Sequence, residues 1–343
     1  MLETKPKIVS EIAENKQTQN NFNFRQLLQF SLNTNRILTL LGIMMLISLV
    51  ASVFGLIFDP RTLGGMPIWT KPAKFSISLA LYVFTLIWLL SYVKGHPRLV
   101  RLVSWVTFIA FFVEMIIVVT QVIRGVSSHF NVATPLDAAL FSLMGNFIML
   151  FWVANLLAAV LLLFQRFDNP AFAWSLRLAL ILALAGAMLG MLMALQRTPE
   201  QQLAIAAGQH LTTAGAHSVG VQDGGPGLPF LGWSTVGGDL RIGHFVGLHA
   251  LQFLPLLGWL ILRFTRTGFT RMHQVILVWV AGAGYAGLIA LFTWQALRGQ
   301  SIIAPDALTL AGFGALVVAT CLGAGGVGLH ARTRKSRLAV SQS

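Results

Sequence analysis

One carboxylate, Glu114, stands in the middle of a long apolar stretch of the sequence. An ionisable group in hydrocarbon is costly, so it is usually paired and often marks a functional site. Gln121 lies seven residues further on and would share a helix face with Glu114. Asn146 follows Asp137 by nine residues and would reach a similar depth on the next helix. Glu114 and Asn146 therefore predict either part of a ligand site or a structural hydrogen bond between helices.

A second polar group occupies residues 238–252, which include two histidines and a glutamine beside apolar residues. His244 and His249 are five residues apart, so on a helix they would point about 140° away from each other. That spacing favours a polar face that lines a cavity over two ligands of one ion. We expect one cavity that opens outward, with Arg241 and His244 at its mouth. Its candidate residues are Glu114, Gln121, Asn146, Arg241, His244, His249 and Gln252.

Basic residues near the same end would attract an anionic or lipid-like ligand. They are Lys71, Lys74, Arg124, Arg197, Arg241 and Arg298. The histidines allow an alternative, a redox enzyme that holds haem or a metal ion, although none has the spacing of a known ligand motif. Its candidate ligands are His129, His210, His217, His244 and His249. A third possibility is an accessory protein whose polar contacts are purely structural.

Eight apolar stretches are long enough to position these residues as membrane-spanning helices, since a bilayer core needs about 20 apolar residues of helix. They are residues 37–58, 75–93, 102–123, 138–164, 178–195, 245–262, 275–297 and 307–329. The composition agrees: 56 % of residues are hydrophobic, 10 % are charged, and a soluble domain would carry about a quarter charged residues. The sequence therefore predicts an all-α, multi-pass transmembrane bundle.

The basic residues also predict the topology. With the N-terminus in the cytoplasm, 17 of the 24 Lys and Arg lie on the cytoplasmic side, as the positive-inside rule requires. We expect both termini inside and the protein in the plasma (inner) membrane. The net charge of +13 then reflects topology and contact with anionic lipid heads, and nucleic acid is not an expected partner.

Two segments lie outside the expected spans. The tail 1–35 is polar, and its residues 22–30 fit either a short helix at the membrane interface or a linker. The loop 196–243 is the long extramembrane segment. Thr198 and Pro199 predict the start of a short helix that runs to about Gly208. The glycine-rich remainder is either a lid over the bundle or a flexible connector, and its aromatic residues favour a lid.

The chain contains an apparent duplication. The strings Gln121-Val-Ile-Arg-Gly and Gln295-Ala-Leu-Arg-Gly end the third and seventh spans, 174 residues apart. Asp137 and Asp306 open the returning spans at an offset of 169, and each can pair with the preceding arginine. We expect two four-helix halves, 36–165 and 172–330, related by an axis along the membrane normal, followed by a basic tail at 331–343.

Two halves of four spans resemble the architecture of haem A synthase, and the resemblance is one of architecture only. In that family axial histidines lie in both halves, whereas the second, fourth and eighth expected spans of this chain carry none. Neither its activity nor its ligands are carried over.

Overall fold

The computed structural model describes residues 23–265 and 268–340, and this part of the chain is all-α apart from two very short hairpins. The helices are α2 (Phe24–Thr34), α3 (Arg36–Phe58), α4 (Thr70–Leu90), α5 (Pro97–Arg124), α6 (Pro135–Leu163), α7 (Pro170–Leu195), α8 (Pro199–Ala206), α9 (Leu240–Phe264), α10 (Arg271–Leu297) and α11 (Ala307–Val340). Eight of them, all except α2 and α8, are long and apolar enough to cross a membrane.

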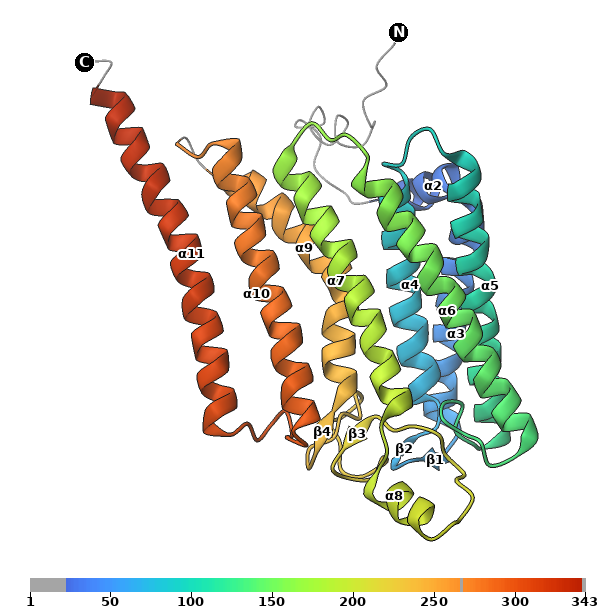
Figure 1. The fold of residues 1–343 in the computed structure, drawn as a ribbon. Coiled ribbons are helices and arrows are strands. Elements are labelled where there is room, and N and C mark those ends of the chain that lie inside the picture. The colour runs from blue at the N-terminus through green and yellow to red at the C-terminus, as the bar shows by residue number, and fades with distance from the viewer. Residues whose placement is uncertain (1–22, 266–267, 341–343) are drawn as a thin grey trace.

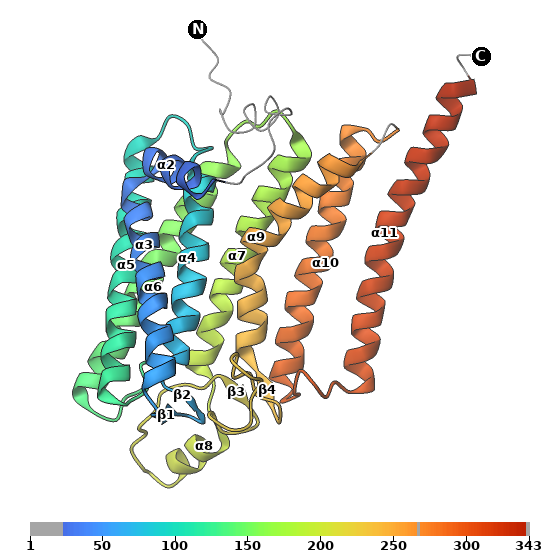
Figure 2. The ribbon, with the colours of Figure 1, turned by 180° about the vertical axis from the view of Figure 1, so that it is seen from behind.

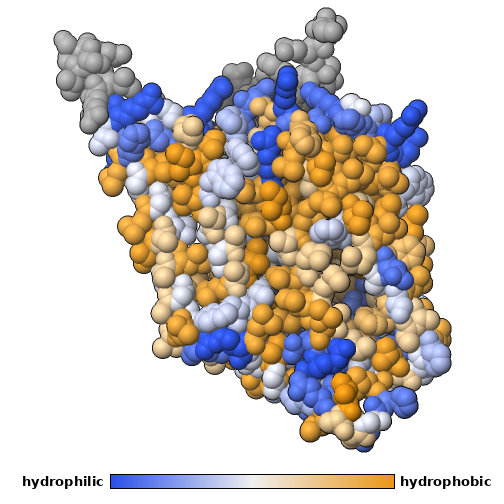
Figure 3. All heavy atoms as spheres, in the orientation of Figure 1, coloured by the Kyte–Doolittle hydropathy of each residue, from blue (hydrophilic) through white to orange (hydrophobic). Residues whose placement is uncertain are grey.

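The outside of the molecule has the pattern of a membrane protein. Apolar residues cover its long sides, and hydrophilic residues gather at the two ends (Figure 3). Many large apolar side chains are exposed, among them Ile57, Leu150 and Trp259. Water would not tolerate so much exposed apolar surface, whereas lipid does. The chain is therefore a multi-pass helical membrane protein.

The spanning helices stand in two neighbouring groups. Helices α3 to α6 form one group, and α7, α9 and α10 stand beside it, with α11 at the edge (Figures 1 and 2). Helices α7 and α9 touch at two glycines, since a Cβ on Gly186 would lie 2.5 Å from the backbone of Gly247. By contrast α11 packs only along α10, and 6 % of its apolar window is buried. Lipid must cover most of α11.

Most of the spanning helices begin earlier than the hydropathy of the sequence predicted, and for α4 and α9 the difference matters for the site. Helix α4 starts at Thr70 instead of residue 75, and α9 starts at Leu240 instead of residue 245. Polar first turns lower the hydropathy of a window without breaking a helix, and Pro72 is tolerated in a first turn. As a result Lys71 and Lys74 are helical residues that project from the end of the bundle.

That end of the bundle, which we call the lid end, also carries the short strands and α8 (Figure 1). Strands β1 (Thr62–Leu63) and β2 (Met66–Pro67) form one antiparallel hairpin, and β3 (Ser218–Val219) pairs antiparallel with β4 (Gly238–Asp239). Helix α2 and the end of α11 lie at the opposite end. Of the two alternatives for residues 22–30, the structure has a helix, α2, capped by Asn23, and residue 22 lies outside the described residues.

Residues 209–239, which we call the lid, fold over the lid end instead of forming a loose connector. The helix expected after Thr198 is α8, which has Thr198 as its cap, also forms a capping box with Gln201, and ends at Ala206, two residues before the expected end. From it, Gln201 donates three hydrogen bonds to Thr213 and Gly215. The lid also meets the β1–β2 hairpin where Gly64 and Gly224 approach closely. These contacts hold the lid against α8 and the β1–β2 hairpin.

Candidate functional site

Glu114 is buried on α5 and meets a loop residue. Its side chain is 2 % exposed, and its Oε1 lies 3.4 Å from Nε2 of His129 in the α5–α6 loop. Its second oxygen, Oε2, is buried with no hydrogen-bond partner. A buried polar atom without a partner is uncommon and points to a bound proton, a water or a ligand group at that position.

His129 joins Glu114 to Lys71. Its Nδ1 lies 2.9 Å from Nζ of Lys71 and 3.2 Å from Oγ of Ser128. An ammonium can only donate, so Nδ1 must accept, and the ring proton then sits on Nε2 and faces Glu114. Burial, together with the nearby charge of Lys71, holds the pKa of His129 well below its usual range. His129 is therefore neutral at pH 7.

Lys71 and Lys74 form a positive group at the start of α4. The charges of Lys71, Lys74 and Arg241 lie close enough to repel one another. Nζ of Lys74 donates a hydrogen bond to the backbone oxygen of Leu231 in the lid, at 2.9 Å. Within the described residues neither ammonium forms an ion pair with a carboxylate. Cations at this depth normally have a partner, so these two are free to take an anion.

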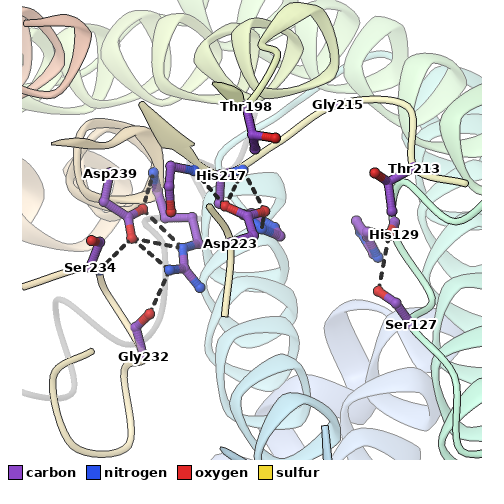
Figure 4. Close-up of polar contacts among 12 residues, drawn as sticks. Ser127, His129, Thr198, Thr213, Gly215, His217, Asp223, Gly232, Ser234 and Asp239 are labelled. Carbon is purple, nitrogen blue, oxygen red and sulfur yellow. Dashed lines mark hydrogen bonds and ion pairs between the residues drawn. The ribbon is translucent and has the colours of Figure 1, made fainter. Parts of the chain in front are cut away.

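Arg241 has less freedom than the lysines. Its guanidinium binds both oxygens of Asp239, at 2.6 and 2.9 Å, and also the backbone oxygen of Gly232. Asp239 is buried, caps α9, and accepts a further bond from the backbone N–H of Ser234 (Figure 4). Arg241 therefore fastens the lid to the start of α9 and contributes its charge from a fixed position.

A second ion pair lies inside the lid, between the Arg241 group and His129 (Figure 4). Nδ1 of His217 donates to Asp223 at 2.9 Å, and the backbone N–H groups of His217 and Ser218 donate to the same carboxylate. Burial lowers the pKa of His217, although Asp223 acts to raise it. Burial opposes the charge of Asp223, but the bonds from His217 and Ser218 lower its pKa. The ring of His217 packs edge-on against Phe130, the neighbour of His129, so the lid and the α5–α6 loop are packed together.

The polar residues of α9 make contacts of their own. His249 bonds to Gln252 at 3.1 Å, and Gln252 donates to the hydroxyl of Thr85 on α4, also at 3.1 Å. His244 donates to the backbone oxygen of Gly186 on α7 at 2.7 Å. Gln252 thus joins α9 to α4 across the boundary of the two helix groups, below the lysines. His244 instead fixes α9 to α7.

Two expected site residues lie elsewhere. Asn146 is exposed on α6, so the expected pairing with Glu114 is replaced by the contact with His129. Gln121 bonds to Asp137, which also pairs with Arg124 at 2.6 Å, and so belongs to the α5–α6 hairpin.

The histidines of the metal or haem alternative are also dispersed. His210 is exposed on the lid. Across the described residues no group of three or more His, Cys, Asp or Glu could hold a metal ion. His129, His217, His244 and His249 each hydrogen-bond to a different protein group.

Two cavities lie away from Glu114 and the lysines. A small one, about 20 Å³, is bounded by Tyr82, Trp152 and Asn155 between the helix groups and could hold about one water. The hydroxyl of Tyr82 donates to Asn155 there. A shallow apolar groove of about 510 Å³ runs between α10 and α11 beside Trp294. Its walls suit lipid tails.

Sequence reasoning placed Lys71 only among the basic residues at the mouth and His129 only among possible metal ligands. The missing information was the path of the α5–α6 loop. Helix α5 ends at Gly125, whose φ of 75° is left-handed, and Phe130 has a φ of 61°. These turns fold His129 back over Glu114, and no periodicity in the sequence reports such a turn.

No family model, no curated protein and no solved structure matches the chain. What defines it is its own fold and site: a multi-pass helical membrane protein with a buried Lys–His–Glu row under a folded lid.

Proposed function

We propose that this protein binds a small anion of the carboxylate or phosphate class at Lys71 and Lys74, beneath the lid. One observation carries the proposal: two ammonium groups, one helical turn apart, face the same layer without a carboxylate partner. Their present acceptors, His129 and the backbone of Leu231, are neutral, and an anion between them would supply the negatively charged acceptor that they lack. Arg241 adds attraction from a fixed position.

The lid would control access to this site. Lys74 is tied to Leu231, and the lid is fastened to α9 through Arg241 and to α8 through Gln201. A ligand that displaces the Leu231 oxygen from Lys74 gains an ammonium and frees part of the lid. Below the site, Gln252, Thr85 and the small cavity at Tyr82 lie where the two helix groups meet. In transporters built from two halves, the ligand usually passes along the boundary between the halves. For this reason we extend the proposal from anion binding to anion transport.

The anion site is preferred to a metal or haem centre because of the donor sets. A metal site needs several histidines or acids directed at one point, whereas these histidines are directed at Lys71, Asp223, Gly186 and Gln252. Two lysines with no acid partner would repel a metal ion instead of binding it.

We also infer that the bundle arose from a duplicated four-helix unit. Gln121 donates to the backbone oxygen of Ser127, and Gln295 donates to that of Ser301, six residues on in both cases. Each helix then ends at a left-handed glycine, and the arginine before it pairs with the aspartate of the next hairpin. Such agreement in contacts supports the offset of about 170 residues.

The lid end is, in this proposal, the extracytoplasmic face of the plasma (inner) membrane, and both termini are cytoplasmic. The distribution of Lys and Arg supports it. Reporter fusions at Gly220 in the lid and at Ser336 should report opposite compartments. The same compartment for both would overturn the topology.

A thermal-shift screen tests anion binding. The purified protein is heated with acetate, sulfate, inorganic phosphate or a short-chain phosphatidic acid, and a ligand that binds the folded state raises Tm. The first three report a free anion, and stabilisation by the phosphatidic acid alone would identify a lipid headgroup. The shift should disappear in Lys71→Gln and persist in Lys94→Gln, a lysine outside the site. No shift with any of the four would overturn the proposal.

A further inference from the structure

Glu114, His129 and Lys71 form a continuous row that the binding of an anion to the lysines does not by itself require. We propose that this row is a proton relay and that the site takes up a proton on Glu114 when it binds its anion. The inference rests on the proposed anion site and adds a second, coupled ligand to it, the proton.

A hydrogen bond from Lys71 and a close contact with Glu114 give the relay its direction. His129 accepts from Lys71 at Nδ1 and faces Glu114 with Nε2. When the Nε2 proton moves to Oε1 of Glu114, Nδ1 takes a proton from the Lys71 ammonium. One proton has then passed from Lys71 to Glu114, and the imidazole is neutral again in its other tautomer.

The new tautomer frees Lys71. Its Nδ1 now carries a hydrogen and no longer accepts a bond, so Lys71 is no longer held by His129. Lys71, left as an amine, regains a proton from water on the lid side and turns its ammonium toward the anion. The site therefore takes up one anion and one proton. The proton on Glu114 originates from Lys71, and the proton that restores Lys71 comes from water.

Electrostatics favours the same balance. In the free site the charge of Glu114 is offset mainly by Lys71, the cation at the far side of His129. An anion bound to Lys71 competes for that positive charge, and its own negative charge disfavours a second anion at Glu114 in a low-dielectric layer. A proton on Glu114 removes the conflict. Oε2, which has no hydrogen-bond partner, is a second position that such a proton can occupy.

The other charged groups around the relay are not placed to take up the proton instead of Glu114. The groups that face the relay are Lys74 on α4, His217 in the lid and His244 on α9, with Arg241 behind them. Arg241 is committed to Asp239, and His217 to Asp223. In the described part of the chain Glu114 is the carboxylate in contact with His129.

Calorimetry can count the proton. Acetate and sulfate, which do not titrate near pH 7, are each bound to the purified protein in two cationic buffers of different ionisation enthalpy. The difference in heat gives the number of protons taken up. We expect uptake that approaches one proton per anion for the wild type and none for Glu114→Gln, which should bind the anion at least as tightly. Glu200→Gln, which changes an exposed carboxylate on α8, should keep the uptake.

Three outcomes are informative. Binding without proton uptake in the wild type would overturn the relay and leave the anion site standing. Equal uptake in the wild type and Glu114→Gln would also overturn the relay, whereas the absence of any binding heat would count against the anion site itself. A second measurement needs only the wild type: the logarithm of the acetate dissociation constant should rise with pH, by up to one unit per pH unit around neutrality. A flat profile would contradict the relay.

Discussion

His129 and Glu114 are fifteen residues apart in sequence, yet Nε2 of the histidine lies 3.4 Å from Oε1 of the glutamate. Helix α5 carries the carboxylate, and the loop that follows α5 turns back to cover it. The contact links Glu114 to the lid end through His129 and Lys71.

This contact yields a prediction on stability. His129→Phe keeps the ring but leaves the buried carboxylate of Glu114 without its partner, which should cost about 1–3 kcal/mol. Glu114→Gln removes the charge, so the double variant should recover part of that loss. Reversible unfolding in detergent gives the free energy of unfolding of the wild type, the two single variants and the double variant. Strict additivity of the two single changes would show that the side chains do not interact.

A second prediction concerns the crossing of α7 and α9. Gly186→Ala places a Cβ against the backbone of Gly247, and backbone cannot rotate away, so we expect a loss of about 1–3 kcal/mol. Gly145 on α6 has open space at its Cβ position and is the matched control. Equal Tm values for Gly186→Ala and Gly145→Ala would contradict the close packing.

The lid gives a third prediction. Gln201 donates to Thr213 and Gly215 from a buried position, and its loss leaves their oxygens without partners. Gln201→Ala should therefore destabilise the lid by about 1–3 kcal/mol and speed amide exchange in residues 209–217. Gln202→Ala, an exposed neighbour, should change little. Identical exchange in both variants would argue against α8 as the anchor of the lid.

The lid should also loosen in acid. His129 and His217 have pKa values below their usual range in the folded protein, so the unfolded state binds more protons than the folded state. Stability contributed by these groups is present above the unfolded histidine pKa of about 6.5 and is lost as the pH falls below it. The lowered pKa of Asp223 extends the loss to below about pH 4. Amide exchange of the lid, corrected for its intrinsic rate, should be faster at pH 5.5 than at pH 7, and unchanged protection would contradict this.

The sequence predicted the eight spanning helices because long apolar runs have few alternatives in a membrane. It also singled out Glu114 as a costly buried charge. It placed the starts of α4 and α9 five residues too late, since hydropathy is low wherever a helix begins with polar residues. Lys71 was thereby assigned to a loop instead of a helix end.

The partner of Glu114 could not be found from helix geometry. Equal depth on neighbouring helices suggested Asn146, but depth does not give rotation, and Asn146 faces outward on α6. The partner comes from a loop whose path depends on left-handed residues such as Gly125 and Phe130. The contacts of Gln121 with Asp137, in contrast, follow from the repeated hairpin motif.

The central claim is that Lys71 and Lys74 bind an anion, and equilibrium binding of radiolabelled sulfate to the purified protein at pH 7 tests it most directly. The account predicts saturable binding that Lys71→Gln weakens by about tenfold or more, because one charge-assisted contact is worth about 1.5–3 kcal/mol. Lys94→Gln, which removes the same charge away from the lid end, should bind like the wild type. Equal affinities for Lys71→Gln and Lys94→Gln would contradict the claim.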